Sequence, residues 1–303
     1  MILCIGEILV DMIGKKHNDK VVYERFAGGA PFNVACNIKK QNGEVGFIGS
    51  VGDDLIGDFL VSFSEKQNFD CLSLKKLNDR NTTLAFVELD EKGERAFSFY
   101  RKNTADYCIE ARSVNDLIDK AKIVHIGSLM LSEKSGRRFA DKIFNLAKKK
   151  GKLVSFDVNF RDDIYSSRTE AVKVYKKYIC AADILKFSED EVAMFSKFDD
   201  LRDILRAEQL AFVTLGARGS KCIYKGREYA KDSIRVQVKD TTGAGDAFYA
   251  GVLSQLDRYN NLDEAIANIE YILKYSNICG ALTTTNFGAI DASPTQNDVL
   301  KFI

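Results

Sequence analysis

Histidine and net charge are both scarce in this 303-residue sequence. Its two histidines, His17 and His125, have no second ligand at the spacing of an H-E-x-x-H motif, so histidine-based zinc hydrolysis and a Ser-His-Asp triad are poorly supported. The 44 Lys and Arg residues nearly balance the 43 Asp and Glu residues, which leaves a formal net charge of +1. We therefore expect no nucleic-acid partner held mainly by bulk charge.

Long hydrophobic runs are missing as well. No apolar stretch approaches the roughly 18 residues that a membrane span needs. The N-terminus has no basic flank and meets acids at Glu7 and Asp11, unlike a signal peptide. The seven cysteines are scattered and never form a C-x-x-C pair, which argues against a disulfide framework and a zinc ribbon. We therefore expect a soluble cytoplasmic protein without a membrane partner.

Proline is limited to Pro31 and Pro294, and no linker, tandem repeat or low-complexity tract divides the chain. Short apolar runs alternate instead with amphipathic stretches, a βαβα pattern typical of a mostly parallel α/β sheet covered by helices, in one domain over residues 1–303. The expected strands are Ile2–Ile5, Val45–Val51, Ile123–Gly127, Leu153–Asp157, Ile184–Phe187 and Phe212–Leu215. The expected helices are Pro31–Gln41, Asp54–Gln67, Glu133–Lys149, Arg168–Cys180, Ala244–Leu256 and Leu262–Ala281.

Two segments interrupt this alternation, Val21–Phe26 and Thr82–Arg101, and both have the pattern of β-hairpin strands. The second segment has a turn at Asp90–Gly93. After this turn, one parity of the strand carries Arg95, Phe97, Phe99 and Arg101. Aromatic residues flanked by arginines suit a lid over a polar ligand, but the same pattern fits an ordinary half-buried edge hairpin.

The segment Asp240–Gly251 carries the strongest chemical signal. Gly243 and Gly245 open an amphipathic stretch, so that N–H groups at a helix N-terminus can approach an anion. Asp246 would repel that anion unless it has a task, and removing a proton from a hydroxyl nucleophile during phosphoryl transfer is such a task. The alternative is that Asp246 only caps the helix and the glycines only turn the chain.

The usual nucleotide-binding motifs are absent. The sequence has no G-x-x-x-x-G-K-[ST], no H-R-D loop, and no G-x-G-x-x-G after a strand, because Phe248 takes the place of the third glycine. Any ATP site is therefore of neither the P-loop nor the protein-kinase type, and a Rossmann dehydrogenase is disfavoured.

A second candidate site begins at Gly28 and Gly29. Paired glycines let the backbone approach a ligand, Pro31 favours a helix start, and Asn33 then lies in the first turn. Together with Asp11, these residues form a carboxylate-and-amide set suited to sugar hydroxyls. Alternatively, the glycines only make turns.

The segments Gly28–Gly57 and Asp240–Gly251, in this order and at this separation, closely resemble the two signature segments of the ribokinase-like (PfkB-type) carbohydrate kinases. The resemblance extends from about Ile5 to Pro294. It implies a doubly wound α/β fold with helices on both faces and a small β-sheet lid, with lid strands at about residues 16–27 and 81–106. It also implies ATP as phosphate donor, Mg²⁺ as cofactor, and a sugar hydroxyl as acceptor.

The resemblance assigns roles residue by residue. Asp246 matches the catalytic base, and the anion hole is matched by Gly243, Ala244 and Gly245. The positions that match sugar-binding residues are Asp11, Gly28, Gly29 and Asn33. Asp240 and Thr242 match positions that in many members hold a monovalent cation such as K⁺, together with carbonyl groups from the loop around Ala281–Ala289.

The nucleotide side also has counterparts in this chain. The segment Thr214–Gly219, with Thr214, Gly216 and Gly219, resembles the family's nucleotide-binding strand and turn, and Asn277–Gly288 resembles the wall around adenine. Many ribokinases have Asn-x-x-Glu after the central strand, whereas this chain has the sequence from Lys186 through Ser188 to Glu191, a form frequent in fructokinase-like members. Lys186, Ser188 and Asn277 are therefore expected on the nucleotide side, with Glu191 organising Mg²⁺ indirectly.

The acceptor is indicated by the Asp-x-Asn-x-Arg segment, which contains Asn159 and Arg161, and by Arg101 at the end of the lid strand. These segments resemble the fructokinase and 2-keto-3-deoxygluconate kinase branches more than ribokinase or adenosine kinase, and Gly28–Asn33 favours fructokinase. Three other functions stay open: a sugar-acid kinase, a ribokinase or nucleoside kinase, and a non-catalytic sugar-binding protein. Arg161 could also have a purely structural role. The apolar parity of the lid also favours a homodimer.

Overall fold

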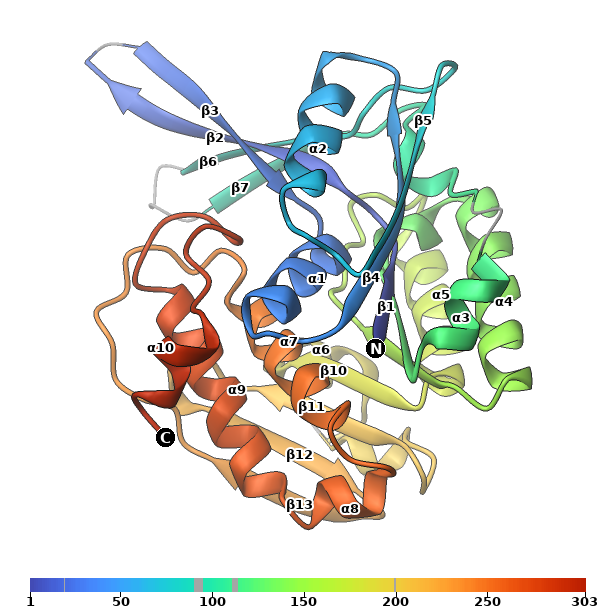
Figure 1. Cartoon of the computed structure of the whole chain (residues 1–303), viewed down its shortest axis with the longest axis vertical. Helices are drawn as coiled ribbons and strands as arrows, with labels where there is room; N and C mark the ends of the chain where they lie inside the picture. Colours follow the sequence, from blue (N-terminus) through green and yellow to red (C-terminus); the bar gives the residue numbers. More distant parts are fainter. Residues whose placement is uncertain (19, 90–94, 111–113, 199) are drawn as a thin grey trace.

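A nine-stranded sheet forms the centre of the computed structural model, which describes residues 1–18, 20–89, 95–110, 114–198 and 200–303 (Figure 1). The strand order is β13-β12-β11-β10-β9-β8-β1-β4-β5. Neighbouring strands from β11 to β5 pair in parallel, whereas β12 and β13 add an antiparallel edge. The strands are β1 (Ile2–Ile5), β4 (Val45–Gly52), β5 (Cys71–Leu77), β8 (Ile123–Ile126), β9 (Leu153–Asp157), β10 (Ile184–Ser188), β11 (Leu210–Thr214), β12 (Ser220–Tyr224) and β13 (Arg227–Lys231).

Helices cover both faces of this sheet, as the sequence predicts. One face packs against α3 (Val114–Lys120), α4 (Lys134–Lys149), α5 (Arg168–Ala181) and α6 (Glu189–Phe195). The other packs against α1 (Ala30–Lys40), α2 (Leu55–Glu65), α7 (Ala244–Leu256), α8 (Leu262–Ile266) and α9 (Ile269–Thr283), and α10 (Gln296–Leu300) lies against α9. Strand β1 shows why both faces of the sheet are covered. Leu3 and Ile5 belong to the first core, and Ile2 and Cys4 belong to the second. Side chains that alternate between two apolar layers bury a strand on both faces.

A second, smaller sheet projects from the body at the top of Figure 1. Its strand order is β3-β2-β6-β7, with antiparallel pairs β2–β3 and β6–β7 and a parallel pair β2–β6. The strands are β2 (Leu9–His17), β3 (Lys20–Gly28), β6 (Leu84–Leu89) and β7 (Arg95–Tyr100). Because β3 ends two residues before α1 begins, this small sheet leads directly into the first turn of that helix.

Most of the predicted elements lie within a few residues of the observed ones. The predicted helix Leu262–Ala281 is wrong as one continuous helix, because the structure divides it into α8 and α9. Between them, the Asn268 side chain donates a hydrogen bond to Glu264 O at 3.1 Å, and an amide that bonds nearby backbone favours a helix end over a helix interior. Strands β2, β5, β12 and β13 lie outside the predicted strands, and the predicted turn Asp90–Gly93 lies outside the described residues.

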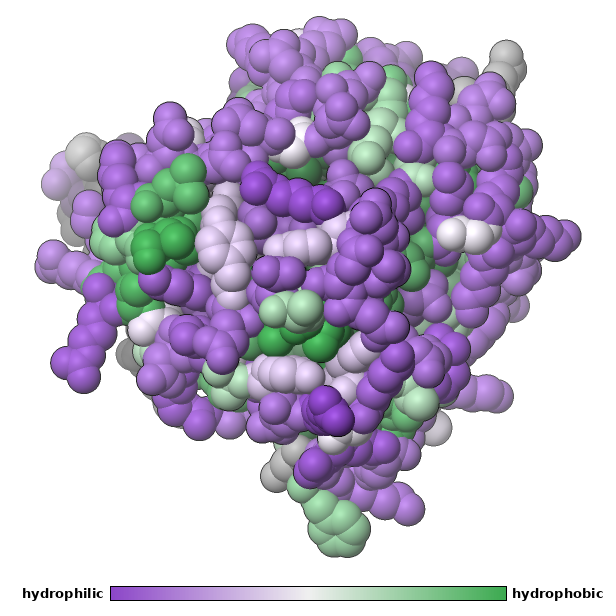
Figure 2. Space-filling model, turned by 60° about the horizontal axis from the view of Figure 1, so that its bottom comes forward, coloured by the Kyte–Doolittle hydropathy of each residue, from purple (hydrophilic) through white to green (hydrophobic). Residues whose placement is uncertain are grey.

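The surface around the antiparallel edge of the large sheet is mostly hydrophilic. Figure 2 brings this lower part of the molecule forward, and its hydrophobic residues form small, separate groups between charged and polar ones. Within the described ranges, no helix is both long and apolar enough to cross a membrane.

Candidate active site

A cavity of about 350 Å³, which we call the Asp246 cavity, lies near the carboxyl ends of β1, β9 and β10 and the N-termini of α1 and α7. Ligands of open α/β sheets bind at this edge of the sheet. The two segments predicted to form the site, Gly28–Gly57 and Asp240–Gly251, meet at this cavity. The predicted site residues that line the cavity are Asp11, Gly29, Asn33, Asn159, Arg161, Lys186, Thr242, Gly243, Gly245 and Asp246.

Asp246 lies in the first turn of α7 and faces the first turn of α1. Its Oδ2 accepts a hydrogen bond of 2.8 Å from Nδ2 of Asn33. Burial raises the pKa of Asp246, while the Asn33 bond and the positive charges of Lys186 and Arg161 oppose that rise. A carboxylate whose pKa is raised by burial binds a proton more readily than an exposed aspartate, and this suits a general base.

Gly243 sets the start of α7. It is the N-cap residue and has a left-handed backbone with φ of 74°. A Cβ built at this position would lie 2.5 Å from the Cβ and 2.6 Å from the Cα of Ala289, so Ala289 packs directly behind it. The first N–H groups of a helix have no partner within the helix and attract anions. The N-terminus of α7 can therefore bind a phosphate beside the Asp246 carboxylate.

Asp240 connects the segment before α7 to the loop after α9. Its Oδ1 accepts hydrogen bonds from the backbone N–H of Thr242 at 2.8 Å and from the Thr242 hydroxyl at 2.7 Å. Its Oδ2 accepts the N–H of Gly288 at 3.1 Å. The carboxylate is buried and holds the two segments together.

Lys186, which lines the Asp246 cavity, forms a buried ion pair with Asp157. Nζ of Lys186 lies 3.1 and 3.0 Å from the two carboxyl oxygens of Asp157. Burial raises the pKa of Asp157 to about 7, against the effect of Lys186. Lys186 is also the nearest side chain to Gly245, since a Cβ at Gly245 would lie 3.2 Å from its Nζ. The ammonium group is therefore placed between a carboxylate and the start of α7.

Gly28 makes room for the carboxylate of Asp11 on the neighbouring strand. A Cβ at Gly28 would lie 2.2 Å from Oδ2 of Asp11, so a larger residue would displace that side chain. Asp11 lines the Asp246 cavity, whereas Gly28 supports it from behind. The two glycines thus have different roles: Gly28 leaves space for the Asp11 side chain, and Gly29 lines the cavity itself.

A second cavity, of about 560 Å³, lies on the other side of the start of α7, and we call it the Asn277 cavity. It contains the predicted nucleotide-side residues Thr214, Gly216, Gly219 and Asn277, together with Ala244. Its apolar wall includes Val236, Val238, Phe248 and Ala281. Thr241 and Gly245 line both cavities, so two ligands could meet at the N-terminus of α7.

Ser188 and Glu191 line neither of these two cavities. They form a capping box at the start of α6, in which the backbone N–H of Ser188 donates to Oε2 of Glu191 at 2.7 Å. Oε1 of Glu191 accepts the N–H of Phe160 at 2.7 Å. Glu191 thus joins the segment after β9 to the one after β10. Lys186 lines the Asp246 cavity instead of the Asn277 cavity.

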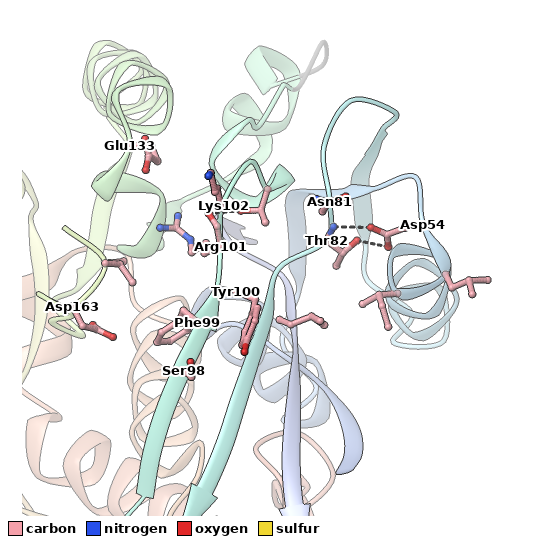
Figure 3. A pocket seen from close by; sticks show the side chains of 15 residues that line it. Asp54, Asn81, Thr82, Ser98, Phe99, Tyr100, Arg101, Lys102, Glu133 and Asp163 are labelled. Atoms are coloured by element: carbon pink, nitrogen blue, oxygen red, sulfur yellow. Dashed lines mark hydrogen bonds between the residues drawn. The ribbon is translucent and has the colours of Figure 1, made fainter. Parts of the chain in front are cut away.

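A third cavity, of about 1010 Å³, lies between β7 and the start of α2 and is lined by Arg101 (Figure 3). The guanidinium of Arg101 donates to Asp106 Oδ2 at 2.7 Å, to Ser132 Oγ at 2.5 Å and to Leu129 O at 2.9 Å. Its side chain is 6% exposed and that of Asp106 is 0% exposed. The structure does not bring Arg101 into the Asp246 cavity, because these buried partners hold its guanidinium.

Both ends of the β6–β7 hairpin are fastened to the body. At its start, Asp54 accepts hydrogen bonds from the N–H and the hydroxyl of Thr82, at 2.7 and 2.8 Å, as the dashed lines in Figure 3 show. The next residue, Thr83, donates to Asp106 at 2.6 Å, and Arg101 reaches the same carboxylate from the other end. Two carboxylates therefore anchor the hairpin at its base.

Two buried carboxyl groups near the site, Glu7 and Asp157, are missing from the sequence-based assignments. Glu7 lines the Asp246 cavity, is 0% exposed, and has no hydrogen-bond partner for either carboxyl oxygen within the described structure. Burial raises its pKa to about 8. Their positions at the ends of apolar strands could have indicated a functional role, because burying a carboxyl group there costs free energy unless it has a partner or a function.

Comparison with known proteins agrees with this geometry. The sequence pattern of the pfkB family carbohydrate kinases matches residues 1–296. The chain is 35% identical to a probable chloroplastic fructokinase of Arabidopsis thaliana, over 98% of this chain and 81% of that protein. It is 34% identical to a fructokinase of Zea mays, over 100% of this chain and 97% of that protein.

Solved structures of fructokinases are also similar to this chain. The fructokinase of Xylella fastidiosa with bound ATP superposes with a TM-score of 0.91 at 30% identity, covering 100% of this chain and 97% of that one. A fructokinase of Vibrio cholerae with fructose, ADP and a calcium ion bound superposes with a TM-score of 0.88 at 31% identity, covering 99% and 98%.

Proposed function

Because this chain belongs to the pfkB family of carbohydrate kinases, we propose that it is an ATP-dependent fructokinase that converts fructose to fructose 6-phosphate. The observation that carries the proposal is the meeting of two cavities at Thr241 and Gly245, with Asp246 on one side. One cavity has carboxylate, amide and arginine groups suited to a sugar, and the other has an apolar wall and glycine backbone suited to a nucleotide.

Asp246 acts as the general base in this proposal. Its carboxylate removes the proton from the acceptor hydroxyl, the hydroxyl oxygen forms a bond to the γ-phosphorus, and the bond from that phosphorus to the bridging oxygen of ADP breaks. Asn33 holds the carboxylate in place through its hydrogen bond. Backbone N–H groups of Gly243 and Gly245 stabilise the negative charge of the transferring phosphoryl group. The N–H of Ala244 donates to Thr241 O at 3.3 Å and would have to turn from that carbonyl to join them.

The small sheet acts as a lid over the sugar. Leu9 and Asp11 of β2 and Phe99 of β7 line the Asp246 cavity, so this sheet already forms part of its wall. Closure would exclude water from the phosphoryl group and limit wasteful ATP hydrolysis. Hydrogen exchange tests this role, because fructose should protect residues 82–89 if the lid closes, and unchanged exchange would contradict it.

Mg²⁺ fits the site only as a metal bound mainly through phosphate and water. In the described part of the chain, no three His, Cys, Asp or Glu residues are grouped so that they could hold a metal ion. Mg²⁺ usually keeps several waters and binds through one or two carboxylates together with substrate phosphates, and it neutralises charge on the transferring group. Asp157 is the carboxylate that would contact its waters. Glu191 does not fit the indirect role predicted from the sequence, because both of its carboxyl oxygens accept backbone N–H groups, of Phe160 and Ser188, and it lines neither cavity. Asp240 and Thr242 would lie beside a monovalent cation such as K⁺.

The sugar-acid alternative rests on Arg161, which lines the Asp246 cavity and could bind a carboxylate. The deciding experiment measures ADP release with fructose, ribose, adenosine and 2-keto-3-deoxygluconate on the wild type, Asp246→Asn and Arg161→Ala. We expect fructose to have the highest kcat/KM and Asp246→Asn to lose about 10²–10⁴-fold in kcat.

The possible outcomes separate the hypotheses. A preference for the sugar acid that Arg161→Ala abolishes would replace fructokinase by a sugar-acid kinase. Near wild-type turnover in a folded Asp246→Asn protein would refute the assignment of the base. A wild-type protein that binds fructose but releases no ADP with any acceptor would be a sugar-binding protein.

The location and the oligomeric state stay predictions. We propose that the protein is cytoplasmic. We also propose a homodimer that pairs through the small sheets, because Tyr23, Phe86 and Tyr100 form a row of edge-to-face aromatic contacts there, with ring centroids 5.1 Å apart. Tyr100 is 63% exposed, and burying such a row against a second copy would be favourable. Sedimentation should show a dimer, and a monomer at all concentrations would contradict this prediction.

A further inference from the structure

Lys40, in the last turn of α1, binds three backbone carbonyls of one turn. Its Nζ donates hydrogen bonds to the carbonyl oxygens of Ile290 at 2.5 Å, Ser293 at 3.3 Å and Asp291 at 3.4 Å. The side chain is half-buried against the loop that follows α9. An ammonium group has three donors and no acceptor, so this one contacts three carbonyls of the turn, as a bound cation would.

The turn that Lys40 holds lies directly behind the proposed anion hole. Ala289, next to Ile290, leaves no space for a Cβ on Gly243, since such an atom would lie 2.5 Å from the Ala289 Cβ. Gly288 donates its N–H to Asp240, whose carboxylate also holds Thr242. A displacement of residues 288–293 would therefore reach the start of α7 through van der Waals contact and through hydrogen bonds.

The same helix holds the proposed base at its other end. Asn33 and Lys40 are seven positions apart on α1, so they lie on one face, about 10 Å apart along the helix axis. Asn33 donates to Asp246, and Lys40 donates to the turn behind Gly243. Helix α1 also packs against α7. A single rigid element thus sets the distance between the base and the backbone that supports the anion hole.

The neighbouring Lys39 provides a comparison. It is on the same helix, but its Nζ pairs with Asp70 at 2.9 Å, on a partly exposed surface far from residues 288–293 in the chain. Removal of Lys39 eliminates one positive charge and one salt bridge of α1, with no loss of a contact to the turn. An exposed pair of this kind contributes little to stability.

We propose that Lys40 is a positioning residue for phosphoryl transfer, a tethered cation that holds residues 288–293 behind the anion hole at a set distance from Asp246. The inference rests on the proposed kinase function of the same site. Without the ammonium, three carbonyls lose a charged donor, and the turn can move away from Gly243. Because phosphoryl transfer depends on alignment, a shift of a fraction of an ångström lowers kcat without removing any group that contacts fructose.

The test compares Lys40→Met, Lys40→Arg and Lys39→Met with the wild type. For Lys40→Met we expect kcat to fall about tenfold or more while KM for fructose changes less than about twofold. Lys40→Arg keeps the charge and the donors and should recover most of the kcat, and Lys39→Met should match the wild type. Propylammonium chloride should partly restore kcat of Lys40→Ala, and sodium chloride at equal ionic strength should not.

A second measurement does not depend on activity. Hydrogen exchange of residues 286–293 should be faster in Lys40→Met than in the wild type and unchanged in Lys39→Met. Wild-type kcat in Lys40→Met, or an equal loss of kcat in Lys39→Met, would overturn the proposal. A wild type inactive with every acceptor would refute the kinase function, and unchanged exchange of residues 286–293 in Lys40→Met would then overturn the role of Lys40 separately.

Discussion

Asn33 donates a hydrogen bond of 2.8 Å from Nδ2 to Oδ2 of Asp246, which lies 213 positions later in the sequence. The bond joins the first turn of α1 to the first turn of α7. It stabilises the ionised carboxylate and so opposes the burial that raises the pKa of Asp246. The residue proposed to bind the sugar thereby also controls the protonation of the proposed base.

Loss of the Asn33 amide should therefore change the pH dependence of turnover. In Asn33→Ala the pKa of Asp246 rises further, so the base is protonated up to a higher pH and the acidic limb of kcat moves to higher pH. Asn33→Asp should move it more, because a second carboxylate disfavours ionisation of the first. Profiles of kcat from pH 5 to 9 check this prediction, and identical acidic limbs in all three proteins would contradict it.

The two glycines at the start of α7 should respond differently to alanine. Gly243→Ala places a Cβ on a left-handed backbone, at a cost of about 1–2 kcal/mol, and against the backbone of Ala289. Gly245→Ala meets only the flexible end of Lys186, so the protein should fold normally and lose kcat through the changed approach to phosphate. Thermal unfolding and kcat of both variants distinguish the two effects. Equal Tm values would contradict the assignment of strain to Gly243.

Arg101 should matter for stability more than for acceptor choice. Arg101→Met leaves the carboxylate of Asp106 buried without its cation, which typically costs about 3–5 kcal/mol. Replacing both partners, in Arg101→Met/Asp106→Leu, should recover part of that loss because no unpaired charge is left. Urea unfolding of the two variants and their KM for fructose provide the measurement. A large rise in KM at unchanged stability would instead place Arg101 at the acceptor.

Glu7 should make stability fall as pH rises. Its pKa is about 8 in the folded protein and 4.5 for an unperturbed glutamic acid, so between these values the folded state holds a proton that the unfolded state has lost. Unfolding then releases a proton and becomes more favourable with increasing pH. Glu7→Gln removes this dependence, and its Tm advantage over the wild type should grow from pH 5 to pH 8. A constant difference in Tm would show that Glu7 is ionised in the folded protein.

Local patterns predicted much of this molecule. Strand β1 was recognisable because four apolar residues face two cores, and the start of α7 because glycines precede an amphipathic run. Strand β13 was not, since it lies at the edge of the sheet with none of its residues buried, and three of its five residues are charged. Local sequence also placed Asp11 and Asn33 near one ligand, because Asp11 comes shortly after the end of β1 and Asn33 lies in the first turn of the next helix, and both segments meet at one edge of the large sheet.

The sequence by itself thus determined the layered fold and the two glycine-rich segments of the site, because periodicity and backbone requirements are local properties. The tertiary structure decided which partner each charged side chain has. Arg101 follows aromatic residues at the end of a strand, a pattern that suggested a ligand-binding arginine. In the structure, Asp106, Ser132 and Leu129 bind its guanidinium instead. Lys39 and Lys40 are adjacent lysines, yet one pairs with a surface aspartate and the other with three carbonyls about 250 positions away. Such choices depend on distances and burial between remote segments, which no local pattern records.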